Sequence, residues 1–269
     1  MTHVIIFDSG VGGLSVSAQV RALLPNVRQS YIADDAFRPY GEKSGAELQA
    51  RLPGLLRTLE ALLAPDVIVI ACNTASTAAL SEIREAVNVP VVGVVPAIKP
   101  AAGDSRTKVI GILGTPGTVH RDYVDQLIAD FADDCRVVLH GSTRLVQMSE
   151  DKLSGIDVSP DDLRAEITLL FKQAGAGKID HIVLACTHFP LLKSDLAKVT
   201  PHEVTWIDSG EAIARRVKTL VRNAEHKSGM EDTAFLIGGR SGEARSKAFG
   251  GFGFHRVVSL PDYDPENCR

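Results

Sequence analysis

The sequence is poor in aromatic residues and contains no long apolar run. Phe, Trp and Tyr together make up 5% of its 269 residues, whereas apolar residues as a whole make up 45%. The core must therefore consist mainly of Val, Ile, Leu and Ala, a composition that suits sheets covered on both faces. No apolar run approaches the roughly 20 residues needed to cross a bilayer, so we expect no membrane partner.

The chain also lacks a strong excess of charge. Its formal net charge is −4 at pH 7, and charged residues make up 23% of the sequence. A small negative charge gives no electrostatic reason to bind nucleic acid or an anionic membrane surface. We therefore expect no nucleic-acid partner.

Cysteine is scarce, and its spacing excludes two common roles. The four cysteines are Cys72, Cys135, Cys186 and Cys268, and none lies in a CxxC pair or at a zinc-like spacing. Neither a disulfide framework nor a metal site is indicated, and a reduced, cytoplasmic protein is expected. The first strand begins almost at the amino terminus, which leaves no room for a signal peptide. We interpret Cys135 as a packing residue and Cys268 as a thiol of the tail.

Short apolar runs alternate with helical patterns along the whole chain. This alternation predicts an α/β fold with parallel sheets and helices on both faces. We expect two doubly wound lobes, the first formed by residues 1–95 with 208–269 and the second by residues 96–207. The expected strands are Val4–Phe7, Ser30–Ala33, Val67–Ala71, Val91–Val94, Val109–Leu113, Arg136–His140, Ile182–Ala185, Thr205–Ile207, Ala234–Ile237 and His255–Ser259.

Local signals predict where several helices begin and break. Ser159-Pro160 supplies a capping hydroxyl and a proline at the first helical position. Pro53-Gly54 is expected to kink or split the helix over residues 46–63, because proline removes a backbone hydrogen bond. We expect one helix over Thr77–Val87 and another over Gly117–Asp130.

The most informative feature is a pair of matching turns. Ala71-Cys72-Asn73-Thr74 and Ala185-Cys186-Thr187-His188 each follow an apolar strand directly. The carboxyl ends of parallel strands lie at one edge of their sheet, and ligands bind there. Two thiols in matching positions suit a reaction that must be served from two opposite faces. Racemisation at a carbon is such a reaction.

The neighbours of both cysteines favour chemistry over packing alone. A cysteine that begins a helix has its thiolate stabilised by the helix dipole. Asn73 and Thr74 add polar groups beside the free N–H groups of that helix, which together make an anion site. His188 can exchange a proton with Cys186 in the physiological pH range. Glu150 is either a surface acid of a helix or an acid near His188.

Two further turns follow predicted strands. Asp8-Ser9-Gly10 opens a Gly-rich stretch, but Ser15 occupies the last position of a GxGxxG pattern, which argues against a dinucleotide cofactor. The Asp8 carboxylate can hold an ammonium group, relay a proton to a thiol or cap a helix. Pro39-Tyr40-Gly41 is either a plain turn or a set of backbone donors for a second carboxylate.

Together these motifs resemble those of the cofactor-independent glutamate racemases, in the aspartate/glutamate racemase family. The resemblance spans nearly the whole chain, and the motifs occur in a shared order. They are Asp8-Ser9-Gly10-Val11-Gly12-Gly13, Pro39-Tyr40-Gly41, Ala71-Cys72-Asn73-Thr74-Ala75, Gly93-Val94-Val95-Pro96-Ala97, Gly111–Gly117, Leu145-Val146 with Glu150, and Ala185-Cys186-Thr187-His188. The tail segment Phe235–Gly239 departs from the pattern, since it lacks the expected hydroxyl-rich sequence.

The resemblance implies two lobes related by a pseudo-two-fold, with glutamate as the small-molecule substrate between them. It implies Cys72 and Cys186 as the catalytic acid/bases, with Asp8 assisting the first and His188 and Glu150 the second. It also implies catalysis without cofactor or metal, and the supply of D-glutamate for peptidoglycan. Homodimers are common in the family. The implied substrate-binding residues are Asp8, Ser9, Tyr40, Gly41, Asn73, Thr74, Thr187 and His188.

Other readings use the same residues. The protein could racemise aspartate or another amino acid, or act as a decarboxylase that uses one of the two cysteines. It could be a redox protein with a Cys72–Cys186 disulfide, or an amino-acid-binding module without catalysis.

Overall fold

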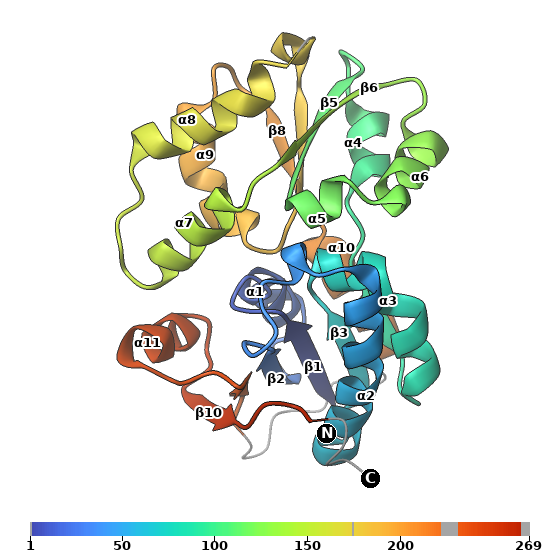
Figure 1. Ribbon diagram of the computed structural model, residues 1–269, viewed down its shortest axis with the longest axis vertical. Coiled ribbons are helices and arrows are strands. Elements are labelled where there is room, and N and C mark those ends of the chain that lie inside the picture. Colours follow the sequence, from blue (N-terminus) through green and yellow to red (C-terminus); the bar gives the residue numbers. More distant parts are fainter. Residues whose placement is uncertain (1, 174, 222–230, 265–269) are drawn as a thin grey trace. The chain divides into compact units, whose positions relative to one another are not determined.

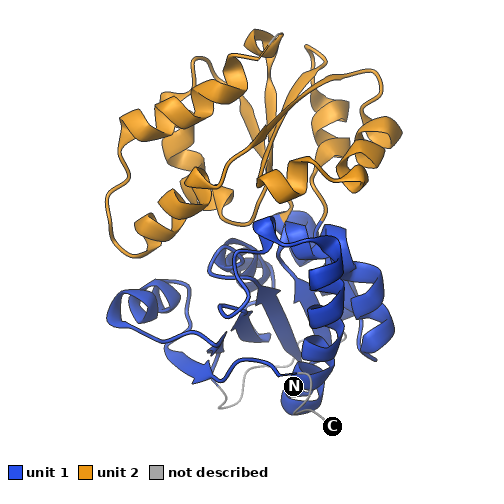
Figure 2. Ribbon diagram, viewed as in Figure 1, with its two compact units in different colours: residues 1–94, 210–269 blue, residues 95–209 orange. Residues whose placement is uncertain are grey.

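The computed structural model describes residues 2–173, 175–221 and 231–264. The chain divides into two compact units (Figure 2). Unit 1 consists of residues 1–94 with 210–269, and unit 2 consists of residues 95–209. Each unit is built on one parallel sheet. The predicted α/β class is therefore confirmed.

Unit 1 contains a six-stranded sheet in the order β10-β9-β2-β1-β3-β4 (Figure 1). Its strands are β1 (His3–Asp8), β2 (Arg28–Ala33), β3 (Val67–Ile70), β4 (Val91–Gly93), β9 (Thr233–Ile237) and β10 (Arg256–Leu260). Its helices are α1 (Leu14–Leu23), α2 (Gly45–Leu63), α3 (Asn73–Ala86), α10 (Gly210–Leu220) and α11 (Glu243–Gly251). β1 has β2 on one side and β3 on the other. The carboxyl ends of β1 and β3 therefore flank a topological switch point.

Alternate residues of the unit 1 strands face opposite layers of helices. Ile5 and Phe7 of β1 belong to a buried cluster that includes leucines of α2 and alanines of α3. Val4 and Ile6 are also fully buried, and because side chains alternate along a strand they face the other way. Helices α1 and α10 contact each other and do not contribute to the first cluster. This two-sided burial fixes the register of the strands, and with it the residues at their carboxyl ends.

Helix α2 is not split at Pro53-Gly54, one of the two outcomes predicted there. It runs without interruption over Gly45–Leu63, and it begins with a capping box between Ser44 and Glu47. Pro53 removes one backbone hydrogen bond. Burial of a leucine contributes about 1.5–3 kcal/mol, so a row of buried leucines on one face outweighs that loss. These leucines are Leu48, Leu52, Leu55, Leu56 and Leu59.

Unit 2 contains a four-stranded sheet in the order β6-β5-β7-β8. Its strands are β5 (Val109–Gly114), β6 (Arg136–Gly141), β7 (His181–Ala185) and β8 (Thr205–Ile207). Its helices are α4 (Ile98–Asp104), α5 (Pro116–Val119), α6 (Asp122–Phe131), α7 (Arg144–Leu153), α8 (Pro160–Phe171) and α9 (Lys193–Val199). The order matches β2-β1-β3-β4 of unit 1, strand for strand. Gly114 pairs with Ala185, so β5 and β7 end side by side.

The two faces of this sheet carry separate cores. Ile182 and Leu184 belong to a buried cluster with residues of α7, α8 and α9. Val183 and Ala185 belong to another, with residues of α4, α5 and α6. Figure 1 shows these two groups of helices on opposite sides of the sheet. Strand β7 is thus buried on both faces, and Cys186, which follows it, belongs to the first of these clusters.

Two predicted helix boundaries were wrong. Helix α3 begins at Asn73 rather than Thr77, because the first turn is buried at the end of the sheet. The pattern over 117–130 divides into α5 and α6, since Pro116 starts a helix early and Arg121 has extended backbone angles. The predicted Ser159 cap is confirmed, and its hydroxyl accepts the Asp162 N–H. None of the described helices is both long enough and apolar enough to cross a membrane.

Candidate active site

Cys72 lies where strand β3 gives way to helix α3 in unit 1. It is the N-cap residue of α3, with an extended backbone conformation, and it is 6% exposed. The positive end of a helix dipole stabilises a thiolate at this position. Because α3 starts at Asn73, Cys72 lies directly at that end of the helix.

Asp8 ends the neighbouring strand β1 and is fully buried. Its Oδ2 accepts hydrogen bonds from the Gly10 N–H at 3.3 Å and the Gly13 N–H at 3.1 Å. The Tyr31 hydroxyl donates to the Gly10 carbonyl at 2.8 Å. Burial raises the pKa of Tyr31 well above its ordinary value, and the charge of Asp8 raises it further. The Tyr31 phenol therefore stays protonated. Its hydrogen bond to Gly10 helps to hold the glycine loop, residues 10–13, around the Asp8 carboxylate.

Ser9, Asn73 and Thr74 surround the thiol of Cys72. The Ser9 Oγ lies 3.9 Å from the Cys72 Sγ, within the range of a weak hydrogen bond to sulfur. Asn73 and Thr74 are 5% and 3% exposed. The buried Oδ1 of Asn73 has no hydrogen-bond partner in the described part of the chain. Buried amide groups are normally paired, so this oxygen is a candidate contact for a ligand.

The predicted Tyr40-Gly41 turn lies beyond strand β2. Tyr40 opens a short 3₁₀ helix, Tyr40–Glu42, is 1% exposed, and donates its hydroxyl to the Asp34 Oδ2 at 2.6 Å. Burial raises the pKa of Tyr40, and Asp34 and a charged Cys72 raise it further. Tyr40 is therefore a protonated donor within electrostatic reach of Cys72.

Cys186 occupies the matching position of unit 2, directly after strand β7. It is 7% exposed, and its Sγ lies 3.8 Å from the His188 Nδ1. The His188 Nε2 lies 3.4 Å from the Glu150 Oε1. Of the two readings of Glu150, the structure thus favours the acid near His188.

Helix α7 holds this turn through groups that sequence reasoning missed. The fully buried Ser149 hydroxyl lies 3.0 Å from the His188 carbonyl oxygen, and Lys152 donates to the Leu191 carbonyl at 2.9 Å. A small polar residue on the buried face of α7 was the available signal. Thr187, between the cysteine and the histidine, is 6% exposed.

The structure thus brings the predicted residues together as two groups, one in each unit. Unit 1 holds Asp8, Ser9, Cys72, Asn73 and Thr74 at the ends of β1 and β3, with Tyr40-Gly41 beyond β2. Unit 2 holds Cys186, Thr187, His188 and Glu150 between the end of β7 and α7.

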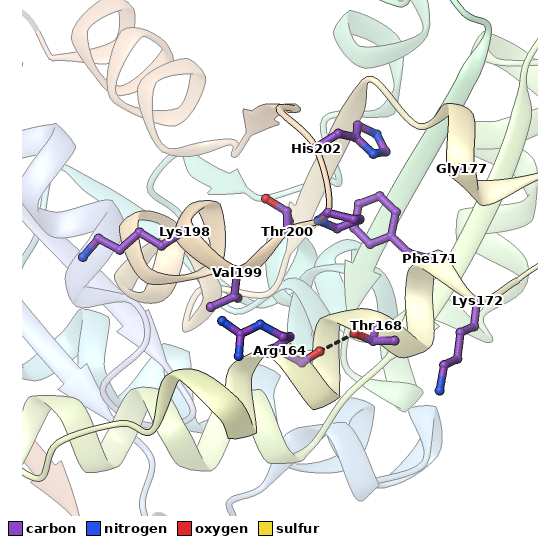
Figure 3. Close-up of a pocket in the computed structure, with 10 residues that line it drawn as sticks. Arg164, Thr168, Phe171, Lys172, Gly177, Lys198, Val199, Thr200 and His202 are labelled. Carbon is purple, nitrogen blue, oxygen red and sulfur yellow. Dashed lines mark hydrogen bonds between the residues drawn. The ribbon is translucent and has the colours of Figure 1, made fainter.

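A pocket of about 530 Å³ lies elsewhere in unit 2 (Figure 3). Phe171, Thr200 and His202 contribute to its lining. The His202 Nε2 lies 2.7 Å from the carbonyl oxygen of Ile179, just before β7 begins. The pocket is therefore at the amino-terminal edge of the sheet, whereas Cys186 follows the carboxyl-terminal end of β7. It is not the candidate active site.

Cys135 has no comparable setting. Cys135 packs beside the cluster around α4 and α6, and burial raises its thiol pKa, as does the nearby Asp134. Cys72, Cys135 and Cys186 are free thiols, and Cys268 lies outside the described residues. Within the described ranges, no group of three or more His, Cys, Asp or Glu side chains is placed to hold a metal ion.

Buried thiols beside proton-exchanging groups, at matching edges of two parallel sheets, define an acid–base enzyme of the α/β class. The chain belongs to the Asp/Glu/hydantoin racemase family, whose model matches residues 14–217. Members of this family are isomerases.

Several similar proteins are named glutamate racemase. The chain is 45% identical to a glutamate racemase of Shewanella sp. (strain MR-4), over 86% of this chain and 84% of the relative. It is 49% identical to a glutamate racemase of Aliivibrio fischeri (strain MJ11), over 81% of each chain. The crystal structure of Escherichia coli glutamate racemase with L-glutamate and the activator UDP-MurNAc-Ala is similar with a TM-score of 0.89. Its identity is 39%, over 98% of this chain and 99% of the other.

Proposed function

We propose that the protein is a glutamate racemase that interconverts L- and D-glutamate by proton transfer at the α-carbon, with Cys72 and Cys186 as the two acid/base groups. The observation that carries the proposal is the match between the two groups of site residues, one in each unit, which we call half-sites. Each cysteine directly follows the corresponding strand, β3 or β7, of sheets with the same strand order. Similarity to named glutamate racemases supports glutamate as the substrate.

The proposed reaction needs one thiolate and one thiol. Starting from L-glutamate, the Cys186 thiolate removes the α-proton, and the Cys72 thiol delivers its own proton to the opposite face. Starting from D-glutamate, the two cysteines exchange roles. Each turnover leaves the pair with reversed protonation, and proton exchange with water resets it. The reference pKa of a thiol, about 8.5, keeps both forms accessible near physiological pH.

The α-proton of an amino acid is weakly acidic, so the site must stabilise a carbanion-like state. Hydrogen-bond donors and dipoles fixed around the substrate carboxylate supply this stabilisation. In the proposal, Asn73, Thr74 and the amino-terminal end of α3 serve the α-carboxylate, together with Thr187. The backbone donors of Tyr40-Gly41 bind the second carboxylate of glutamate, and Asp8 and Ser9 serve the ammonium group.

Each thiol has its own assistant. Asp8, buried beside the end of β3, serves Cys72, and Ser9 lies 3.9 Å from the sulfur. His188 serves Cys186, and Glu150 orients the imidazole from its far side. An imidazole can take or return a thiol proton in the physiological range.

The proposal includes the supply of D-glutamate for peptidoglycan and catalysis without a cofactor. A cytoplasmic location and a homodimeric state stay predictions from the sequence and its resemblance.

The direct test follows the optical signal of purified protein incubated with L-glutamate and, separately, with D-glutamate, without added cofactor. Circular dichroism should decay toward zero from both sides. Glutamate that keeps its optical signal would contradict the proposal. Faster conversion of aspartate in the same assay would reassign the substrate, and release of carbon dioxide would indicate a decarboxylase.

A further inference from the structure

Arg51 of helix α2 grips a buried carboxylate at the end of strand β2. Its Nε donates to the Asp34 Oδ2 and its Nη2 donates to the Asp34 Oδ1, both at 2.8 Å. The Asp34 side chain is fully buried, and that of Arg51 is 11% exposed. Such two-pronged pairs fix both position and orientation. Asp34 therefore has one well-defined geometry as long as Arg51 is present.

The same carboxylate holds the Tyr40 hydroxyl. The Asp34 Oδ2 accepts the Tyr40 O–H at 2.6 Å, and the Asp34 N–H donates to the Asp8 carbonyl at 3.0 Å. Asp34 thus links the Tyr40-Gly41 turn to the end of β1. Without Arg51, a buried charge would lose its main counter-charge, and breaking a buried pair in this way is costly.

The outer side of the guanidinium contacts the carboxyl-terminal part of the chain. The Arg51 Nη2 also donates to the Asp262 Oδ1 at 2.7 Å, and the Tyr263 ring centroid lies 5.7 Å from its Cζ. Tyr263 packs closely on α2, since a Cβ added to Gly54 would lie 2.2 Å from its hydroxyl oxygen. Phe37 covers the guanidinium at 5.0 Å. Residues 262–263 therefore close over the side chain that holds Asp34.

We propose that Arg51 is a positioning residue for the Tyr40-Gly41 turn, and that Asp262 and Tyr263 help to hold Arg51 in place for this role. This inference rests on the proposed function, in which that turn binds the second carboxylate of glutamate. Arg51 acts on substrate binding through Asp34 and Tyr40 and does not exchange protons with the α-carbon.

The test compares Arg51→Gln with Arg57→Gln, an exposed arginine on the same helix. Arg51→Gln should raise KM for glutamate about tenfold, in line with the loss of a charge-assisted hydrogen bond, and leave kcat within about threefold. Arg57→Gln should keep both constants. Arg51→Lys retains the charge but not the planar fork, so a KM increase of about threefold is expected even if the Gln variant does not fold.

Amide hydrogen exchange of residues 38–43 gives a second reading that needs no activity. Exchange should be faster in Arg51→Gln and Arg51→Lys than in the wild type and Arg57→Gln. A smaller acceleration, with a KM increase of about twofold, is expected for Asp262→Asn. A wild-type KM and wild-type hydrogen exchange in Asp262→Asn would show that residues 262–263 do not help to position the turn.

The outcomes separate this inference from the proposed function. If the Arg51 variants lose thermal stability but keep the wild-type KM and the wild-type exchange of residues 38–43, Arg51 is only structural and the inference is wrong. If the wild type does not racemise glutamate, the proposed function fails. Faster exchange in the Arg51 variants than in Arg57→Gln would then still support positioning.

Discussion

Units 1 and 2 each place a cysteine at the corresponding point of their own sheet, but different residues surround the two cysteines. Both contain four parallel strands in matching order, with Cys72 after β3 and Cys186 after β7. In unit 1 the neighbouring strand ends in a buried aspartate, Asp8, around which a glycine loop folds. In unit 2 the polar partners are His188 and Glu150, the second supplied by helix α7.

Different parts of each unit set the position of the thiol and the identity of its polar neighbours. The sheet of each unit fixes where its thiol lies. Strands that are buried on both faces leave the backbone little conformational freedom at their carboxyl ends. The polar group beside each thiol comes from a neighbouring element, the end of β1 in unit 1 and the turn after β7 with helix α7 in unit 2. The polar neighbour in unit 1 is a carboxylate and that in unit 2 is an imidazole, two groups with different reference pKa values. The two half-sites are therefore equivalent in position and distinct in their acid–base properties.

Replacing either thiol has the largest expected effect. Cys72→Ser and Cys186→Ser should each lower kcat for glutamate by about 10²–10⁴-fold, because positioned proton transfer contributes that much and a hydroxyl is a far weaker acid than a thiol. Steady-state racemisation with both enantiomers measures this. Cys135→Ser is the control and should keep the wild-type rate. Full turnover in either site variant would break the equivalence of the two half-sites.

Replacing the assistants should reveal the difference between the half-sites. Because the two enantiomers are equally stable, kcat/KM must fall equally in both directions, so a direction-specific effect has to be sought in isotope effects. With His188→Asn, steps at Cys186 become slower. The α-deuterium isotope effect should then increase for L-glutamate and decrease for D-glutamate.

Asp8→Asn should give the opposite pattern, with the larger isotope effect for D-glutamate. The overall rate should fall by about 10²-fold in each variant. Isotope effects that change in the same direction for both enantiomers would argue against a separate assistant for each thiol.

The glycine loop of unit 1 can be tested through Gly13. A Cβ there would lie 2.9 Å from the Asp8 Cβ and 2.9 Å from the Tyr31 hydroxyl, so Gly13→Ala should cost about 1–3 kcal/mol of stability and displace Asp8. Urea unfolding and the racemisation rate measure the two effects. Gly103→Ala is the matched control, since its added Cβ has no neighbour within 4 Å beyond the adjacent residues and the backbone of its own helix. Equal stability of both variants would contradict the tight packing of the loop.

The smallest expected effect concerns the amino-terminal edge of the unit 1 sheet. Burial lowers the pKa of His3, and Arg28 lowers it further. Its Nε2 lies 2.8 Å from the Ser30 Oγ. Below its unfolded pKa of about 6.5 the unfolded chain binds more protons than the folded one, so stability falls on acidification through that pH.

His3→Gln should therefore lose less thermal stability than the wild type between pH 7.5 and 5.5, measured by thermal unfolding. The exposed His255 of the same unit provides the control, and His255→Gln should follow the wild type. An identical pH dependence of all three proteins would show that His3 does not contribute.

The sequence allowed the alternation of strands and helices, the two cysteine turns and the Ser159 cap to be predicted, because each depends on neighbouring residues. It did not allow the continuity of α2 past Pro53 to be predicted, since that depends on leucines that are buried only in the folded unit. The contacts of Asp34 with Arg51, and of Ser149 with His188, join positions 17 and 39 residues apart. No local pattern marks such pairs. Glu150 had two readings for the same reason, because its neighbour His188 lies far from it along the chain.

The most direct measurement of the two-thiol account follows L-glutamate in heavy water during the first part of the reaction. Newly formed D-glutamate should carry deuterium at the α-carbon, delivered by Cys72, while the remaining L-glutamate stays protiated. D-glutamate that retains the original proton, or L-glutamate that exchanges as fast as product forms, would indicate a single group acting on both faces and would contradict the account.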